Sequence, residues 1–445
     1  MTKTEQAPRP ARGTALGTTP DLTQGQAQSP PDSRYWKRNL AVLWFGELIA
    51  ISGFSVFMPF LPFYVQELGI TGLKQVAFWS GLLTTAQGVT MAVIAPVWGS
   101  LADRYGRKIM VARAMFGGAL IIASMGFVGN VYQLMVLRAI QGFLTGTVPA
   151  ATTLVASSTP PERRGFAIGL LQMAIYLGGS VGPLIGGLIA DSMGYRPTFW
   201  VTGALLLAAG ILVSALVREE FVPPEHPPGE KKPHLLAGLA LVLNTRALMI
   251  VCGIRVLMRM GVRVVGPALP LFVQQMSPPG TKVASLTGTI SGIGSGASAI
   301  GAVLLGRLVD RIGPRRILIT CGSAACVIYT LQSLTQTPLQ LLGLRVLGGV
   351  AMGGILTSVS ALQASLAPKG RYGAVYGVDT SMVAAANAIS PMIGAALTAS
   401  YGLSAAFLGA AAVYGLATVV VAMVVPRERG KEDRKDAETQ GRGGS

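Results

Sequence analysis

"GSLADRYGRKIM" at residues 99–110 returns, in altered form, as "GRLVDRIGPRRIL" at residues 306–318. Both strings lie between two apolar runs, and both place Gly, Asp-Arg and Gly in the same register before a basic cluster. Two further pairs of strings keep nearly the same offset: 133–142 with 340–349, and 59–68 with 267–276. The chain therefore contains an internal repeat, and we expect its two halves to share one fold.

The composition is that of a membrane protein. Hydrophobic residues make up 51% of the chain and charged residues 12%, with a mean hydropathy of +0.54, whereas soluble domains carry about 25% charged residues. Apolar runs recur that are long enough to cross a bilayer, which takes about 20 residues. We predict an all-α polytopic membrane protein with twelve transmembrane helices in two pseudo-symmetric six-helix bundles. The predicted spans cover residues 39–66, 76–101, 108–128, 131–156, 163–190, 197–217, 246–275, 284–306, 315–335, 337–361, 372–397 and 403–425.

The net charge of +17 would suit a nucleic-acid binder, but the basic residues are concentrated in alternate connections between the spans. This is the positive-inside pattern of membrane proteins. It predicts cytoplasmic termini and a cytoplasmic central loop, and it argues against nucleic acid as a partner. The predicted segments are a disordered N-terminus (1–34), an N-terminal bundle (35–217), a linker (218–245), a C-terminal bundle (246–425) and a tail (426–445).

The sequence offers no catalytic or metal-binding constellation, so we do not expect an enzyme. Cys252, Cys321 and Cys326 lie in or at predicted spans, and His226 and His234 lie in the Pro-rich central loop. Neither a disulfide framework nor a metal site is expected from them. Two like-oriented bundles joined by a linker are typical of transporters, which bind their substrate between the halves. We expect a small-molecule substrate, a lipid bilayer, no cofactor and a monomer.

The first string resembles the cytoplasmic motif of the major facilitator superfamily, Gly-x-Leu-Ala-Asp-Arg-x-Gly-Arg-Lys. Residues 35–72, 310–320 and 337–345 resemble MdtG-like bacterial multidrug efflux proteins, and the whole resemblance covers residues 38–425. It implies drug export in exchange for protons across the inner membrane, driven by the proton gradient. A sugar or metabolite exporter on the same fold is the alternative. A transporter-like receptor is a third possibility, but it would need a larger soluble domain than either terminal segment.

The repeated string predicts a cytoplasmic turn. Gly99 and Gly106 would permit a tight turn, and Asp103 could cap a helix or pair with the neighbouring guanidinium groups. The resemblance implies that this cluster is a conformational latch between the halves; the alternative is a simple topology signal. Pro314 replaces a basic residue in the second copy. The predicted latch residues are Gly99, Asp103, Arg104, Gly106, Arg107, Lys108, Asp310 and Arg311.

"GGSVGPLIGG" at residues 178–187 in the fifth span resembles the antiporter motif of the same family. A Gly-Pro pair can bend a membrane helix, and the other glycines would give a smooth packing face. The alternative is simple helix packing, which small residues support without any transport role. The predicted motif residues are Gly178, Gly182, Pro183, Gly186 and Gly187.

Charges inside the spans are expensive and therefore point to function. Glu47 lies about two turns into the first span, Arg138 in the fourth and Asp379 in the eleventh. We predict that these three residues couple transport to protons, with Glu47 as the preferred proton carrier. Burial favours a neutral carboxyl, and a nearby arginine would favour the charged form. Snorkelling to a headgroup is the alternative, and it suits Asp379 better than Glu47 or Arg138. "RAIQG", which begins at Arg138, resembles the family's fourth-helix motif.

A substrate cavity is expected near the first, fifth and seventh spans. Arg255, Arg259 and Arg263 follow one another at intervals of four residues, so they share one helix face. Facing a cavity, they would attract anions or polar neutral compounds; otherwise Arg255 would sit in a structural pair and the other two would snorkel or contact neighbouring helices. The predicted cavity residues are Phe54, Met58, Gln172, Tyr176, Arg255 and Arg259. Further aromatic and methionine candidates are Phe57, Phe63, Tyr64 and Met173. The alternative for any single one of these residues is a place in the core or facing lipid.

Overall fold

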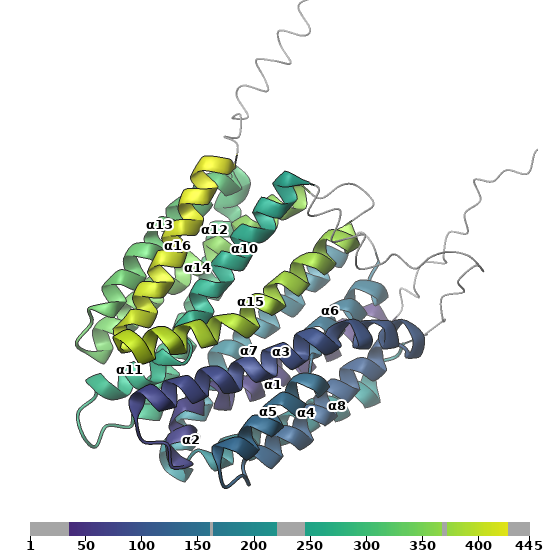
Figure 1. The fold of residues 1–445 in the computed structure, drawn as a ribbon. Helices are drawn as coiled ribbons and strands as arrows, with labels where there is room; N and C mark the ends of the chain where they lie inside the picture. Colours follow the sequence, from purple (N-terminus) through teal and green to yellow (C-terminus); the bar gives the residue numbers. More distant parts are fainter. Residues whose placement is uncertain (1–34, 161–162, 220–244, 367–371, 426–445) are drawn as a thin grey trace, which may run out of the picture.

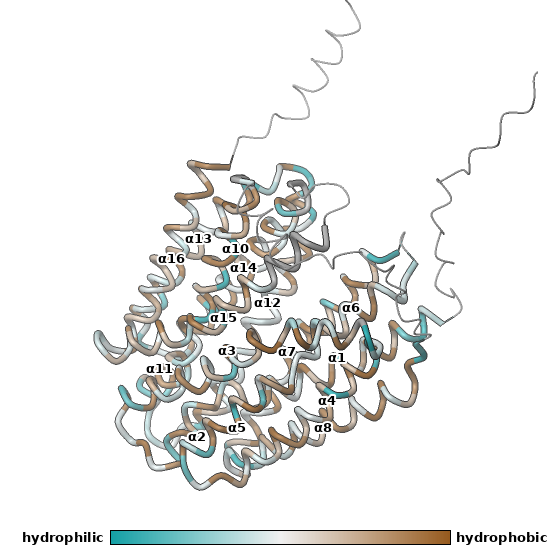
Figure 2. Tube along the Cα trace, turned by 45° about the vertical axis from the view of Figure 1, so that its right-hand side comes forward, coloured by the Kyte–Doolittle hydropathy of each residue, from teal (hydrophilic) through white to brown (hydrophobic). Residues whose placement is uncertain are grey.

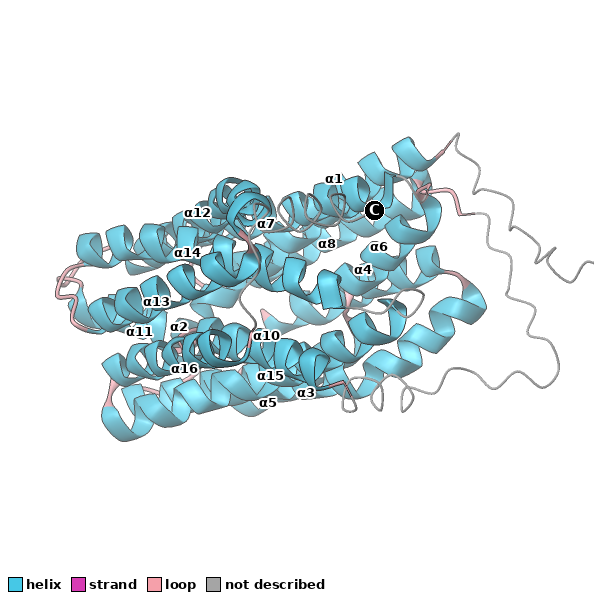
Figure 3. Ribbon diagram, turned by 90° about the horizontal axis from the view of Figure 1, so that it is seen from above, coloured by secondary structure: helices cyan, strands magenta, loops and turns pink. Residues whose placement is uncertain are grey.

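The computed structural model describes residues 35–160, 163–219, 245–366 and 372–425. The predicted disordered N-terminus, most of the predicted linker and the predicted tail lie outside the described residues. Figure 3 shows helices and loops, and no strand, in the part of the chain that is described. Brown, hydrophobic stretches run along the length of the helices in Figure 2. The predicted all-α architecture is therefore confirmed.

The first six spans contain nine helical elements, because the first and fourth spans are interrupted. Their bounds are α1 (Trp36–Phe57), η1 (Met58–Phe60), α2 (Leu61–Glu67), α3 (Leu73–Tyr105), α4 (Arg107–Met125), α5 (Val131–Leu144), α6 (Thr147–Ser158), α7 (Arg164–Met193) and α8 (Arg196–Leu216).

The last six spans repeat this order, except that only their first span is interrupted. Their bounds are α10 (Arg246–Val264), α11 (Ala268–Met276), α12 (Val283–Ile312), α13 (Pro314–Ser333), α14 (Pro338–Leu366), α15 (Tyr372–Tyr401) and α16 (Leu403–Val424). The two halves form two groups of helices, coloured purple to blue and teal to yellow in Figure 1.

Ten helical segments of the described residues are long and apolar enough to cross a membrane. α10, with its arginines, and α13, which begins with Pro314 and two arginines, are not among them. Both nevertheless pack inside the second bundle, α10 against α15 and α16, and α13 against α14 and α16. The twelve predicted spans are therefore all present as helices of the two bundles.

The bundles meet along two helix pairs, α7 with α12 and α3 with α15. On the first pair, Gly187 faces the backbone of Ala284 and Ser285, and Gly288 faces the carbonyl of Pro183. On the second pair, Gly81 faces Ala395 and the carbonyl of Pro391, and Gly88 faces Ala388. We call the end of the molecule where these contacts gather, which holds α2 and α11, the closed end.

The bundles part toward the opposite end, which holds Tyr35 and Val425 and which we call the open end. The face of α7 that contacts α12 continues, by helical period, through Tyr176, Met173 and Gly169. Met173 is exposed, and a Cβ added to Gly169 would meet nothing within 4 Å. A Cβ added to Gly99 of α3 would also meet nothing within 4 Å. Among the described residues, close backbone contacts between the bundles are therefore found toward the closed end and not at these positions of the open end.

Candidate functional site

Glu47 is the one acidic side chain that is fully buried among the described residues, with an exposed fraction of 0%. It lies on α1, which packs against α6, α7 and α8 of the same bundle. Neither carboxylate oxygen has a hydrogen-bond partner; the Thr147 hydroxyl is a polar neighbour without hydrogen-bond geometry. A carboxyl in such a dry, partnerless position is costly to bury as an anion. The site is suited to hold a proton.

Thr147 reaches Glu47 because the fourth span is interrupted. α5 ends at Leu144, Thr145 is extended, and Gly146 has φ 135°, a conformation that favours glycine. α6 then begins at Thr147, so the first turn of a helix lies beside the Glu47 side chain. The predicted fourth span at 131–156 is confirmed as the segment Val131–Ser158, but its continuous apolar run gave no sign of this break.

Arg138 is also fully buried, on α5. Its Nη1 donates to Gln141 Oε1 at 2.8 Å, its Nη2 approaches Met58 Sδ at 3.6 Å, and its guanidinium lies 5.8 Å from the centre of the Phe57 ring. Phe57 is ten residues beyond Glu47 on α1, which is about 15 Å along a helix. The expected influence of a nearby arginine on Glu47 is therefore not seen: the described residues contain a single ion pair, Glu67 with Arg196.

The three arginines of α10 point into the second bundle. Arg255 Nη1 donates to Gln363 Oε1 at 2.7 Å, and Arg263 Nε donates to Asn387 Oδ1 at 3.1 Å. Of the two alternatives for Arg263, contact with a neighbouring helix is confirmed and snorkelling is wrong. Arg255 and Arg259 line a small cavity of about 60 Å³. The other residues of this cavity are Met258, Met352, Ile355, Leu356, Val359 and Val383.

Two predicted cavity residues of α7 lie toward these arginines. Tyr176 is half-buried and within electrostatic range of Arg255 and Arg259 across the bundle interface. Gln172, one turn earlier, is exposed and close enough to interact with the Tyr176 hydroxyl. Tyr176, Arg255 and Arg259 thus bring one hydroxyl and two cations together where the bundles begin to part.

The aromatic candidates of the first span have a different place. Phe54 packs toward Gly118 of α4, and Met58 contacts Arg138, so both are half-buried within the first bundle. Phe57, Phe63 and Tyr64 are core residues with exposed fractions of at most 2%. The alternative of a core position is therefore confirmed for these three residues, whose rings contact Phe199 and Tyr195.

The glycine motif of α7 is a packing face. Gly178 meets the backbone of Leu48 and Ser52 on α1, Gly182 meets Ser52, and Gly186 meets Val56. A Cβ at any of the three would approach a backbone atom within 2.9 Å or less. Gly187 faces α12 instead, and Pro183 lies inside the unbroken α7. The packing interpretation of this motif is confirmed, and its antiport role stays a prediction.

The repeated string forms the turn between α3 and α4. Gly106 has φ 96° and separates the two helices, as predicted. Gly99 was wrongly placed in the turn: it lies inside α3 with open space above it. Arg104 stacks over the Tyr105 ring at 5.3 Å. The side chain of Asp103 lies outside what the structure describes, so its capping role is untested.

A residue that the sequence analysis missed caps α4 instead. The Glu219 carboxylate accepts the backbone N–H groups of Arg107 at 2.9 Å and Lys108 at 2.7 Å. Arg218, beside it, exchanges two hydrogen bonds with the Asn39 side chain at 2.7 and 3.1 Å. The first two residues of the predicted linker are thereby fixed to the first bundle. The available signal was an acidic residue directly after a span.

The second copy of the string is more open. Asp310 and Arg311 are exposed at the end of α12, and Gly313 forms the turn with φ 89°. Arg315 donates to the carbonyl of Ala422 at 2.8 Å, which ties α13 to α16. Asp379 lies on α15, but its side chain is outside the described part of the chain, so its predicted role in proton coupling is untested.

Two six-helix bundles of like order, in close contact toward one end and carrying buried charges, have the architecture of a membrane transporter. The family model of the Major Facilitator Superfamily matches residues 43–276 and 251–444. The chain belongs to this family.

Curated relatives match most of the chain. It is 37% identical over 388 residues to the multidrug resistance protein MdtG of Yersinia enterocolitica, covering 86% of this chain and 92% of that protein. It is 36% identical over 383 residues to MdtG of a Rahnella species, covering 86% and 92%. MdtG of Salmonella typhimurium is 35% identical over 378 residues, covering 85% and 93%.

Solved structures share the fold at low identity. The nucleoside transporter NupG matches with a TM-score of 0.72 at 12% identity, covering 87% of this chain and 100% of that one. A bacterial homologue of the lysosomal transporter Spinster, inward-facing and occupied, matches with a TM-score of 0.72 at 15% identity, covering 88% and 96%. The human organic anion transporter MFSD10 matches with a TM-score of 0.65 at 18% identity, covering 87% and 99%.

Proposed function

We propose that this protein exports drugs and other small amphipathic molecules in exchange for protons, by alternating access between its two bundles. The observation that carries the proposal is the buried, partnerless Glu47 in a chain whose relatives are multidrug resistance proteins. An ionisable residue inside a membrane bundle marks an ion or proton pathway by default. The proton gradient is then the energy source, and no cofactor is required.

The open end faces the cytoplasm in this proposal. Basic residues cluster at that end, on the turns after α3 and α12, and basic loops of membrane proteins stay inside. Both termini are then cytoplasmic, the protein lies in the inner membrane, and the described conformation is open to the cytoplasm. Residues 35–217 and 246–425 are the two moving units, and a single chain holds both, so the monomer is the working unit.

Proton coupling follows from the different surroundings of Glu47 in the two conformations. In the described state the carboxyl is sealed from water between α1 and the start of α6, where a neutral acid is tolerated and an anion is not. Substrate entering from the open end would shift the bundles, expose Glu47 and release its proton inward. After substrate leaves on the far side, a proton from that side would restore the neutral, buried carboxyl.

Substrate recognition is assigned to the place where the bundles begin to part. Arg255 and Arg259 are fixed positive charges, and Tyr176 adds a hydroxyl opposite them. This combination favours anionic or polar neutral groups on an otherwise apolar molecule. Latch residues Asp103 and Asp310 lie at the turns of the open end, away from that place, and would govern switching.

A susceptibility panel in an efflux-deficient bacterial host tests the proposal. We expect expression of the protein to raise resistance to several structurally unrelated compounds, and a proton uncoupler to abolish their extrusion. The Ser192→Ala variant, which among the described residues loses only bonds to carbonyls of its own helix, should behave as the wild type. Resistance to no compound, or high specificity for one sugar or metabolite, would contradict drug export.

A further inference from the structure

The closed end carries a reciprocal pair of amides between the bundles. Gln66 Nε2 donates to Gln274 Oε1 at 3.0 Å, and Gln274 Nε2 donates to Gln66 Oε1 at 3.2 Å. The two residues occupy equivalent positions of the repeat, on α2 and α11. A residue and its repeat equivalent can contact each other only at the pseudo-two-fold axis, so this pair marks the axis where the bundles meet.

A carboxylate makes a second connection between the bundles. Asp191, near the end of α7, accepts the backbone N–H of Ala284 at 3.2 Å and that of Ser285 at 2.6 Å. These groups belong to the first turn of α12, whose free N–H groups and positive dipole end both favour an anion. The repeat equivalent of Asp191 is Ala399, so the other pair, α15 with α3, cannot make this contact.

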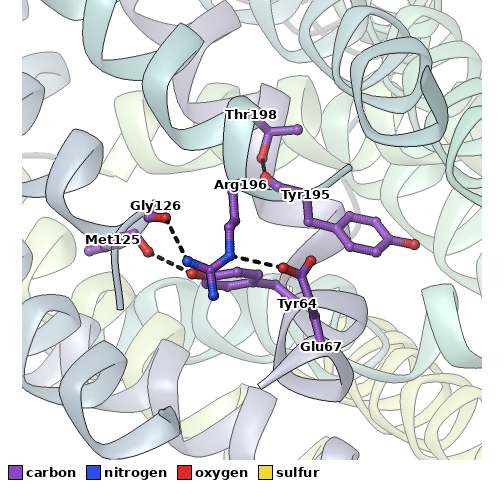
Figure 4. A network of polar contacts seen from close by, with 7 residues as sticks. All are labelled: Tyr64, Glu67, Met125, Gly126, Tyr195, Arg196 and Thr198. Carbon is purple, nitrogen blue, oxygen red and sulfur yellow. Dashed lines mark hydrogen bonds and ion pairs between the residues drawn. The ribbon is translucent and has the colours of Figure 1, made fainter. Parts of the chain in front are cut away.

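A network of polar contacts in the first bundle, shown in Figure 4, lies beside these connections. Glu67, next to Gln66, pairs with Arg196 at 3.0 Å, and Arg196 also donates to the carbonyl of Gly126. The Tyr64 hydroxyl donates to the carbonyl of Met125 at 2.8 Å. Burial, with the nearby carboxylates of Asp191 and Glu67, raises the pKa of Tyr195 to about 12. The two carboxylates thus share a neutral phenol as a neighbour.

We propose that Gln66, Gln274 and Asp191 form an outer clasp, whose strength sets the equilibrium between the two access states. The inference rests on the proposed alternating access. Each of these hydrogen bonds joins one bundle to the other, so each must break when the closed end opens. Water can replace every lost partner at this end, so the net value of each bond is modest. The clasp therefore holds the closed end without making opening prohibitive.

Spin-label distance measurements on the purified full chain test the clasp. Labels would replace Tyr132 and Leu339 at the closed end and, in a second sample, Tyr105 and Ile312 at the open end; all four side chains are exposed. The native cysteines, Cys252, Cys321 and Cys326, would first be changed to serine.

For Asp191→Ala we expect the population with a separated closed end to rise about tenfold, since charge-assisted hydrogen bonds are lost. The distance between the two labels at the open end should decrease in the same proportion of molecules. Asp191→Asn should give a smaller rise, because one amide oxygen can still accept. The double change of Gln66 and Gln274 to alanine should give about a threefold rise.

Two neighbours serve as matched controls. Ser192 bonds only to carbonyls of its own helix among the described residues, and Gln133 bonds within its own bundle. Ser192→Ala and Gln133→Ala should leave all distances unchanged. Unchanged distances in both the Asp191→Ala and the double-glutamine variants, or equal shifts in the controls, would overturn the clasp.

The label distances are measured without any transport assay. The experiment can therefore contradict the clasp while the proposal of drug export holds, and drug export can be contradicted while the clasp holds. If Asp191→Ala does not fold, as judged by size-exclusion chromatography, the test uses Asp191→Asn or the double glutamine variant, because these remove weaker interactions. A shift in these milder variants supports the clasp, and its absence in them counts against it.

Discussion

α1 and α10 open the two halves of the repeat, and they carry opposite charges at equivalent positions. Glu47 of α1 corresponds to Arg255 of α10. The carboxyl is fully buried without a hydrogen-bond partner, whereas Arg255 is bonded to Gln363 and Arg263 to Asn387. A carboxyl can lose and regain its charge, but a guanidinium does not deprotonate in proteins. The comparison assigns a variable charge to the first bundle and a fixed charge to the second.

The fourth and tenth spans repeat this contrast in the backbone. Gly146 and Gly353 are repeat equivalents by their offset, yet Gly146 breaks its helix with φ 135° and Gly353 lies inside the continuous α14. At Gly353 the missing side chain allows the backbone of α12 to approach closely. In the first bundle, the glycine at the equivalent position, Gly146, breaks the helix, so that α6 begins beside Glu47. Among the described residues, the half that carries Glu47 has this break and the other half does not.

The largest expected effect is that of Glu47→Gln. The amide keeps the size of the carboxyl but cannot release a proton, so uphill efflux driven by a pH gradient should fall at least about tenfold. Exchange of labelled for unlabelled substrate without a gradient should continue, since the bundles can still move. Inverted membrane vesicles measure both rates. If this variant kept wild-type uphill efflux and Arg255→Gln lost proton coupling, the proton-coupling residue would belong to the second bundle and not to the first.

The next largest difference is expected between the Arg138→Gln and Arg345→Gln variants. The two arginines are repeat equivalents, so these variants compare the two bundles directly. Arg138 is fully buried and holds Gln141, while Arg345 is half-buried. Loss of Arg138 should lower the free energy of unfolding by about 1–3 kcal/mol and reduce coupled efflux severalfold. Thermal unfolding in detergent and vesicle efflux check the pair. Equal losses in both variants would show that the two halves use these residues alike.

Arg255→Gln with Arg259→Gln tests the fixed charge. Resistance to anionic compounds should fall about fivefold, and resistance to cationic dyes should change less or rise, because two positive charges leave the cavity. Arg263→Gln, whose partner is Asn387 rather than the cavity, is the matched control. An equal loss for both classes of compound would make these arginines structural.

The smallest expected difference in transport rate is that between the Asp103→Asn and Asp310→Asn variants. Both lie at turns of the open end, one in each copy of the repeated string. Asp103→Asn should slow transport about threefold with unchanged equilibrium binding of substrate, because a latch shifts conformations rather than contacts. Asp310→Asn should have a weaker effect, since its copy lacks one basic residue. A large loss of affinity with normal turnover would place Asp103 at the substrate instead.

The positions of the helices were predictable because the membrane demands long apolar runs. The breaks at Gly146 and at residues 265–267 were not, because the hydropathy continues through them. Buried charges stood out in the sequence as candidates, but their partners did not. Gln363 and Asn387 are neutral residues of other spans, and nothing in their local sequence marks them. The sequence could not decide whether Phe57 and Tyr64 lie in the core or line a cavity, because an aromatic side chain suits both places.

Proton release on substrate binding tests the central claim most directly. Purified protein in weakly buffered detergent solution would receive a compound identified by the susceptibility panel, while a pH indicator records the proton change. We predict that the wild type releases protons and that Glu47→Gln binds the compound without releasing any, whereas Arg255→Gln still releases protons on any binding that remains. Undiminished release from Glu47→Gln would contradict the account.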